Sequence, residues 1–231
     1  MPVKKTDIIQ QVIDKRKAQS YLEIGVENGV CFMPIRVRHK VAVDPKFAIT
    51  WKSKLKWLVL NPSNWTAAFH ETTSDDYFAR NPDSRFDVIF VDGLHTYAQS
   101  LKDVVNSLKR LNEGGVIFLH DCLPPHRAAA YPTQISQKQA AELGFDGWTP
   151  EWCGDVWKTV CFLRSQRKDL RVCVLKGDYG LGVVSRGEPE SSLNLSEDAL
   201  NNMTYEDLSR DTVNLLNLKD EDFVPKLLQS L

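Results

Sequence analysis

Short apolar runs alternate with amphipathic segments along residues 1–187. From Thr96 to Leu111, apolar residues recur every three or four positions, which predicts an amphipathic helix. Thr96 with Gln99 three positions later is typical of a capping box, and Gly114 with Gly115 is expected to stop the helix. Strands that alternate with helices predict a parallel sheet with right-handed crossovers. The runs with the length of buried strands are 21–24, 41–45, 86–93 and 116–121.

Weaker patterns predict further elements. Helices are expected over 4–17, from Val30 onward, near 138–143, and over 208–216 and 223–228. A further helix is expected to run through Lys168, with Asp155 as its N-terminal cap. A third strand is expected from residue 69 ahead of a turn at 73–76, and a hairpin with strands at 170–176 and 181–186 around the turn GDYG. Three tryptophans are expected to pack in the core: Trp51, Trp57 and Trp65.

Composition narrows the function classes. The 231 residues are 42% hydrophobic and 26% charged, and no apolar run approaches the roughly 20 residues of a membrane span. The N-terminal segment 1–17 is amphipathic and lacks the apolar region of a signal peptide. The five cysteines form no CxxC pair, so we expect reduced thiols in a cytoplasmic protein.

Charge is distributed unevenly, although the net charge is only −1. From residue 188 onward there are ten acidic and three basic residues, a net charge of −7, which leaves +6 for residues 1–187. This mild basic excess favours an anionic cofactor or substrate. It is too diffuse to predict nucleic-acid binding, so we expect no nucleic acid as partner. The absence of a spanning segment likewise leads us to expect no membrane as partner.

A glycine turn with the pattern E-x-G-x-x-x-G runs from Glu23 to Gly29 after the first strand. Gly25 and Gly29 lack a Cβ, so the backbone can approach a ligand closely there. Asp44 ends the next strand, the place where nucleotide sites put a carboxylate that accepts hydrogen bonds from a ribose diol. The second glycine of the dinucleotide fingerprint is missing, which weakens a pyrophosphate-binding interpretation. Five residues fall at carboxyl ends of expected strands, where α/β sheets bind ligands: Gly25, Asp44, Ser74, Asp92 and Asp121.

These motifs resemble those of class I S-adenosylmethionine-dependent methyltransferases over residues 19–187. LEIGVENG resembles the first motif of that superfamily, VAVDP the second, and TSDDYF the segment that flanks the adenine. The resemblance implies a Rossmann-like, seven-stranded α/β sheet, mostly parallel with a C-terminal antiparallel hairpin and with helices on both faces. It divides the chain into a methyltransferase domain at 1–187 and an acidic helical extension at 188–231.

The resemblance also implies how the domain would hold S-adenosyl-L-methionine. Glu23, Gly25 and Gly29 would hold the methionine end. The implied contacts to the rest of the cofactor are Asp44 to the ribose hydroxyls, Ser74 and Asp75 beside the adenine, and Asp92 at the same site.

The segments FDVIFVDGLHTYAQSLKDV and LNEGGVIFLHD are similar to a subgroup that includes metal-dependent sugar O-methyltransferases of macrolide biosynthesis, and more distantly the catechol type. The similarity implies that Asp92 and the pair His120–Asp121 bind a divalent cation, Mg²⁺ or Mn²⁺, and that His95 is the catalytic base. His120 departs from the pattern, because an acid or amide is commoner there. An imidazole ligand would shift the preference toward Mn²⁺, Fe²⁺ or Zn²⁺, and the alternative is that His120 does not touch the metal.

Methyl transfer from a sulfonium requires alignment of the acceptor oxygen and removal of its proton, which a metal and a histidine can provide. We therefore expect an O-methyltransferase that acts on a hydroxyl of a small molecule or glycan, with homo-oligomer formation through the C-terminal extension. Two other classes stay open: a non-catalytic S-adenosylmethionine-binding or assembly protein, and a nucleotide-sugar or NAD-dependent enzyme on a similar sheet.

Overall fold

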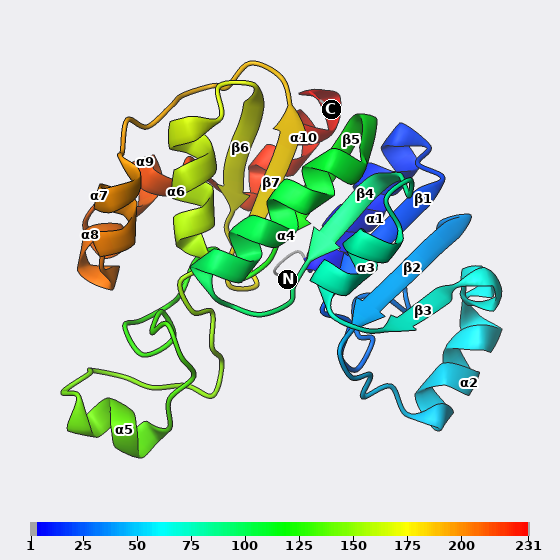
Figure 1. The fold of residues 1–231 in the computed structure, drawn as a ribbon, viewed down its shortest axis with the longest axis horizontal. Coiled ribbons are helices and arrows are strands. Elements are labelled where there is room, and N and C mark those ends of the chain that lie inside the picture. The colour runs from blue at the N-terminus through cyan, green and yellow to red at the C-terminus, as the bar shows by residue number, and fades with distance from the viewer. Residues whose placement is uncertain (1–3, 231) are drawn as a thin grey trace.

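The structure, a computed structural model, describes residues 4–230. These residues form one eight-stranded sheet with helices on both faces (Figure 1). The strands are β1 (Ser20–Ile24), β2 (His39–Asp44), β3 (Ala68–Glu71), β4 (Phe86–Val91), β5 (Leu111–Leu119), β6 (Leu170–Leu175), β7 (Leu181–Arg186) and β8 (Leu218–Lys219). The helices are α1 (Lys5–Arg16), α2 (Trp51–Leu60), α3 (Ser74–Arg80), α4 (Tyr97–Arg110), α5 (Gln137–Glu142), α6 (Trp157–Gln166), α7 (Glu197–Asn202), α8 (Tyr205–Arg210), α9 (Thr212–Leu216) and α10 (Val224–Ser230), with 3₁₀ turns η1 (Pro62–Thr66) and η2 (Glu221–Phe223).

The strand order is β3-β2-β1-β4-β5-β7-β6-β8. The first five strands pair in parallel, and β7 runs antiparallel between β5 and β6. The predicted parallel sheet with a C-terminal antiparallel hairpin is therefore confirmed. The expected count of seven strands is corrected to eight, because the two-residue strand β8 pairs in parallel with β6.

The sheet has a separate hydrophobic core on each face, which explains why the buried stretches of its central strands carry apolar residues at successive positions, such as 88–91 in β4. In β4, Ile89 and Val91 join the core under α4 and α6, whereas Val88 and Phe90 join the core under α1. Successive side chains of a strand point to opposite faces, so a stretch that is covered on both sides is expected to be mostly apolar. Burying Phe90 alone contributes about 2–3 kcal/mol.

Several local predictions are wrong in detail. The segment expected as a turn at 73–76 begins α3, with Thr73 accepting a hydrogen bond from the Asp76 N–H at 3.2 Å. No helix forms directly after Val30, where the chain makes turns instead. The glycines at 114 and 115 lie inside β5, and α4 already ends at Arg110.

Two further corrections concern side chains. Asp155 does not cap α6; its carboxylate accepts a hydrogen bond at 2.6 Å from the N–H of Tyr97, the first residue of α4. Trp51 and Trp65 are not in the core, because their side chains are 70% and 75% exposed.

The C-terminal segment packs on both faces of the sheet. Leu200, Leu208 and Leu216 bury their side chains in the core that contains α6, and Val224 and Leu227 join the core that contains α1. No helix within residues 4–230 is long and apolar enough to cross a membrane.

Candidate active site

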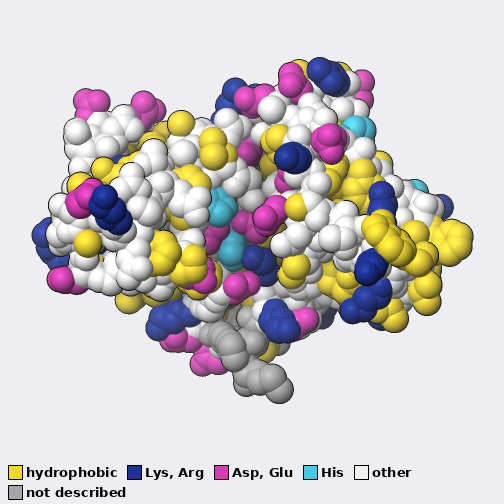
Figure 2. Space-filling model, turned by 90° about the horizontal axis from the view of Figure 1, so that it is seen from below, with side chains coloured by type: hydrophobic (Ala, Val, Ile, Leu, Met, Phe, Trp, Pro, Cys, Tyr) yellow, Lys and Arg dark blue, Asp and Glu magenta, His cyan; other side chains and the backbone are white. Residues whose placement is uncertain are grey.

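A cavity of about 1010 Å³ opens at the carboxyl ends of the parallel strands. Figure 2 shows it as a hollow in which histidine and acidic side chains gather. Gly29, one of the ten residues singled out from the sequence, does not line the cavity; a Cβ there would meet Met33 at 2.9 Å and Ile49 at 3.1 Å. The other nine line it: Glu23, Gly25, Asp44, Ser74, Asp75, Asp92, His95, His120 and Asp121.

Gly25 is required by the close approach of two loops. β1 and β4 are neighbours in the sheet, so the loops that follow them meet. Gly25 has φ +83°, and a Cβ there would lie 1.9 Å from the carbonyl oxygen of Asp92. Any other residue would combine a strained backbone with a collision against a chain segment that carries a site carboxylate.

Glu23 is a buried carboxyl at the start of this loop, with a side chain only 1% exposed. The Tyr21 hydroxyl donates a hydrogen bond to it at 2.5 Å. Burial raises the pKa of Glu23 to about 8, and the negative charge of Asp92 adds to the shift. Burial also lowers the pKa of Lys40 to about 7, although its ammonium donates hydrogen bonds to the carbonyls of Phe32 and Ile35, both at 2.9 Å. A cationic ligand in the cavity would therefore favour the ionised form of Glu23.

Asp44 is held by backbone amides. One carboxylate oxygen accepts the Glu27 N–H at 2.8 Å and the other accepts the Lys46 N–H at 2.7 Å. Each oxygen keeps a further lone pair, so the carboxylate is oriented and still able to accept hydroxyl groups. This arrangement fits a ribose diol.

The far end of the cavity contains an unpartnered polar atom. Asp75, in the first turn of α3, pairs through Oδ2 with Lys102 at 2.6 Å. Its Oδ1 is buried and has no hydrogen-bond partner. A buried acceptor without a donor is costly, so this oxygen fits a ligand amino group such as that of adenine.

Asp103 and Gln99 also line the cavity, although sequence reasoning missed them. The Gln99 amide donates to Asp103 Oδ1 at 3.0 Å and to the Ser74 hydroxyl at 3.3 Å. Burial raises the pKa of Asp103 to about 6. Both residues lie outside the apolar stripe of α4, so the periodicity of that helix gave no reason to select them, and the contact with Ser74 of α3 appears only in the structure.

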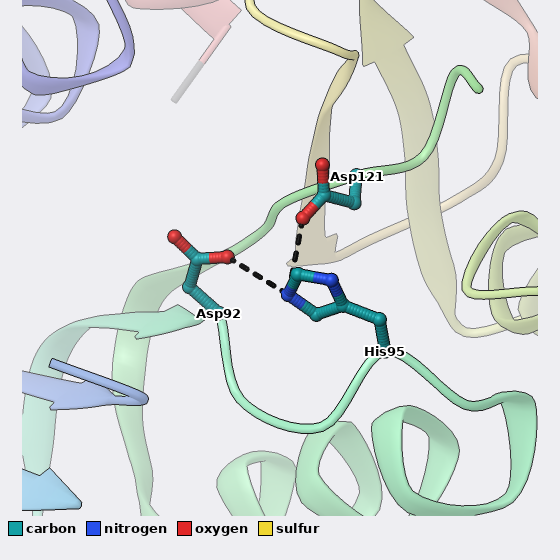
Figure 3. Close-up of side chains that lie close together, drawn as sticks. All are labelled: Asp92, His95 and Asp121. Carbon is teal, nitrogen blue, oxygen red and sulfur yellow. Dashed lines mark ion pairs between the residues drawn. The ribbon is translucent and has the colours of Figure 1, made fainter. Parts of the chain in front are cut away.

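The second half of the site is formed where β4 and β5 end. Asp92 directly follows β4, Asp121 lies two residues after β5, and His95 precedes α4. His95 Nε2 lies 3.2 Å from Asp121 Oδ2 and 3.6 Å from Asp92 Oδ1 (Figure 3). Each of the three side chains presents one ligand atom, and these atoms all lie within 4.8 Å of one another.

The ring of His95 is held in one tautomer. Its Nδ1 lies 2.6 Å from the Trp152 carbonyl oxygen, so this nitrogen carries the hydrogen and donates it. Nε2 is then the nitrogen that takes or releases a proton. Burial opposes protonation, but the hydrogen bond to Asp92 and the charges of Asp121 and Asp92 outweigh it and raise the pKa of His95. Gly154 allows the Trp152 loop to approach, because a Cβ there would lie 1.7 Å from the His95 carbonyl oxygen.

His120 is surrounded by acceptors. Its Nδ1 lies 3.1 Å from Asp92 Oδ1 and 3.0 Å from Asp121 Oδ2, and its Nε2 lies 2.7 Å from the Asp178 carbonyl oxygen. The Lys5 ammonium, a donor, also lies 3.1 Å from Nε2. When both ring nitrogens carry hydrogens, the ring donates to these acceptors and has no lone pair for a metal. Although burial opposes the charged form, the two carboxylates raise the pKa of His120 to about 10.

Lys5 is another site residue that sequence reasoning missed. Its ammonium lies 3.5 Å from Asp92 Oδ2 and 3.7 Å from Asp178 Oδ2, and 3.1 Å from His120 Nε2. A signal was present, since Lys5 lies three and four positions before the buried Ile8 and Ile9 and so shares their sheet-facing side of α1.

The comparisons with known proteins agree with this geometry. Residues 22–122 match the model of a methyltransferase domain family. No curated protein matches the chain. Similar solved structures include a protein from Staphylococcus aureus assigned as a caffeoyl-CoA O-methyltransferase, with 18% identity, a TM-score of 0.57, and coverage of 80% of this chain and 85% of that one.

Two other similar structures contain a cofactor. The O-methyltransferase TomG from Streptomyces achromogenes, in complex with SAM, has 15% identity and a TM-score of 0.55 over 79% of both chains. The SAH-bound methyltransferase PaMTH1 from Podospora anserina has 15% identity and a TM-score of 0.54 over 80% of this chain and 78% of that one. The matched segment is that of a methyltransferase domain, and the fold is the one found in these methyltransferase structures, as the sequence predicted.

Proposed function

We propose that this protein is an S-adenosylmethionine-dependent methyltransferase that transfers a methyl group to a hydroxyl of a small molecule or glycan, with a divalent cation held by Asp92 and Asp121. The observation that carries the proposal is the convergence of Asp92, His95 and Asp121 in the cavity that also contains Asp44 and Asp75. The names of the similar structures support oxygen as the atom that receives the methyl group.

The donor set fits a divalent cation. Asp92 and Asp121 offer carboxylate oxygens, the ligands that Mg²⁺ and Mn²⁺ prefer. In its charged form His120 offers no lone pair, so we assign it to holding the two carboxylates in place rather than to the metal. When bound, the cation would supply a positive charge that lowers the pKa of an acceptor hydroxyl.

His95 is the base in this proposal. The proton of the acceptor hydroxyl passes to His95 Nε2 as the new O–CH₃ bond forms and the S–CH₃ bond of the donor breaks. The hydrogen bond from Nδ1 to the Trp152 carbonyl keeps Nε2 as the basic atom. Ligation and proton transfer would use the same lone pair, so His95 cannot be a metal ligand while it acts as base.

The cofactor would lie along the strand ends. Glu23 and the loop made by Gly25 and Gly29 would hold the methionine end, Asp44 the ribose, and Ser74 and Asp75 the adenine. Asp92 would line both the cofactor and the metal site. S-adenosyl-L-methionine supplies a methyl group that its sulfonium has already activated.

The acceptor would occupy the side of the cavity that the cofactor residues leave free. Gln134, Glu151, Trp152 and Tyr179 are among the lining residues that have no role in holding the cofactor or the metal. Aromatic rings beside amide, carboxylate and hydroxyl groups suit a hydroxylated ring, such as a sugar, which stacks and hydrogen-bonds at once.

The C-terminal extension at 188–231 and the cytoplasmic location are further parts of the proposal. The extension would form a homo-oligomer contact through its acidic surface helices. Sedimentation velocity on the full chain and on an α8 variant, Glu206→Lys, tests this: an oligomer that the variant weakens supports the contact, and a monomer at every concentration contradicts it.

The metal and base assignments are tested by two measurements on one set of variants. Mn²⁺ binding, followed by the loss of the free-ion electron paramagnetic resonance signal, should be abolished in Asp121→Asn and Asp92→Asn. His95→Gln should keep the Mn²⁺ affinity yet lose transfer of a radiolabelled methyl group to a panel of glycosides and phenols. Metal binding that survives in both Asn variants would contradict the metal site, and full turnover by His95→Gln would contradict the base.

A further inference from the structure

Helix α2 presents apolar side chains to the surface rather than to the core. None of its ten residues, all of which the structure describes, is buried. Trp51, Leu55 and Val59 are 70%, 57% and 76% exposed, and their spacing of four places them in one stripe along the helix. Trp65 extends the stripe, since its indole N–H donates to the Leu58 carbonyl at 2.7 Å. Single exposed apolar residues are ordinary, whereas a contiguous set marks an interaction surface.

Lysines flank this stripe on both sides. At 100° per residue, Lys52 and Lys56 follow one edge of it and Lys54 follows the other. All three are exposed, and residues 45–70 contain no acidic residue. We call this surface the α2 patch, formed by Trp51, Lys52, Lys54, Leu55, Lys56, Val59, Leu60 and Trp65.

The α2 patch is connected to the cofactor loop. The Ala48 N–H donates to the Glu27 carbonyl at 2.8 Å, and Ile49 packs against Gly29. Thr50 then caps α2 by accepting the Ser53 N–H at 3.2 Å. Figure 2 shows hydrophobic and basic side chains gathered on the same face of the molecule as the hollow of the active site. A surface bound to the patch would thus lie beside the mouth of the cavity.

We propose that the α2 patch docks this enzyme on an anionic lipid bilayer, with the mouth of the active site beside the membrane surface. A convex helix with an apolar stripe, tryptophans at its margins and flanking lysines matches the interfacial region of a bilayer, where apolar groups enter the acyl boundary and cations meet anionic headgroups. The expectation of no membrane partner rested on the absence of a spanning segment, and the sequence placed these tryptophans in the core.

A second copy of this chain is a poorer occupant. Pairing two α2 patches about a two-fold axis would bring the lysines of one helix against those of the other, which repel across a low-dielectric contact. An anionic bilayer offers the opposite charge to all three lysines at once.

The test is vesicle flotation of the full chain with phosphatidylcholine alone and with phosphatidylcholine plus phosphatidylglycerol. We expect binding to the anionic vesicles only, weakened by added salt. Each lysine near an anionic surface contributes enough for roughly a fivefold change in partitioning, so the triple variant Lys52→Glu, Lys54→Glu, Lys56→Glu should lose on the order of 100-fold or more. Trp51→Ser with Leu55→Ser should also lose binding.

The matched control is Val213→Ser, which removes an apolar side chain of α9 that is 67% exposed. It should bind vesicles as the parent does. S-adenosylhomocysteine affinity should be unchanged in all of these variants, which shows that they are folded and keeps failure of docking separate from failure of the active site. Equal binding to neutral vesicles, or binding that the lysine variant retains, would overturn the proposal. So would a dimer in sedimentation velocity that the Trp51→Ser, Leu55→Ser variant dissociates, with no vesicle binding by the parent.

Discussion

Cofactor binding should release a proton from Glu23. The buried carboxyl has a pKa of about 8, so at pH 6.5 it is protonated in the free protein, and ionising it costs about 2 kcal/mol. S-adenosylmethionine carries an ammonium and a sulfonium group, and its positive charge stabilises the carboxylate. Binding at pH 6.5 should therefore release about one proton, and the association constant should fall about tenfold per pH unit below pH 8. Lys40, with a pKa of about 7, is already mostly protonated at pH 6.5 and cannot absorb that proton.

The assay is calorimetric titration of the cofactor in buffers of different ionisation enthalpy, which counts the protons released. Glu23→Gln should abolish the release and flatten the dependence of the affinity on pH between 6 and 8. Glu27→Gln, which changes an exposed carboxyl of the same loop, is the control and should release the proton as the parent does. No proton release by the parent protein, or the same release by Glu23→Gln, would refute this account of the methionine end of the site.

Three further predictions concern stability and the metal. Asp103 has a raised pKa of about 6, so between pH 4 and 6 the folded state binds more protons than the unfolded state. The free energy of unfolding should therefore fall as the pH rises through that window. Asp103→Asn should remove this loss of stability. In urea titrations it should stabilise the protein by up to about 3 kcal/mol at pH 8 and not at all at pH 4. An equal gain in stability at pH 4 and pH 8 would contradict this prediction. Gly25→Ala should abolish cofactor binding and lower the melting temperature, whereas Gly144→Ala, which has φ +69° but no atoms within 4 Å, should cost only about 1 kcal/mol of backbone strain and keep cofactor binding. Lys5→Met removes a cation from the acidic cluster and should tighten Mn²⁺ binding about tenfold at low salt, whereas Lys4→Met, on an exposed neighbour, should not; no change in Lys5→Met would mean that the two cations do not compete.

The sequence was most informative where one strand carries both the fold and the chemistry. Asp92 and Asp121 each follow a buried parallel strand. Because neighbouring parallel strands end at the same edge of a sheet, residues that follow them lie close together. Gly25 could be identified from the glycine turn after the first strand. The sequence predicted a close approach to a ligand there, and the structure shows a close approach to the loop after β4.

The sequence was least informative where the partner comes from another element. Asp103 is buried and Lys5 reaches the site from α1. The spacing of Lys5 to Ile8 and Ile9 indicates which side of α1 it occupies, but not that this side meets the carboxylates of another element. Asp155 accepts a hydrogen bond from the N-terminus of α4 instead of capping α6 for a similar reason, because a carboxylate can accept a hydrogen bond from the free N–H groups of any helix N-terminus within reach. Trp51 shows a further limit: hydrophobicity predicts burial, but only the fold shows which helix face has no element to cover it.

The cofactor site is best tested by calorimetric titration of S-adenosylhomocysteine into metal-stripped protein. We expect micromolar binding that is abolished in Asp44→Ala, a variant that should keep the circular dichroism spectrum of the parent. We also expect a separate heat for Mn²⁺ that is lost in Asp121→Asn. Absence of cofactor binding by the parent protein, or binding that Asp44→Ala leaves unchanged, would contradict the assignment of this cavity as a methyltransferase site.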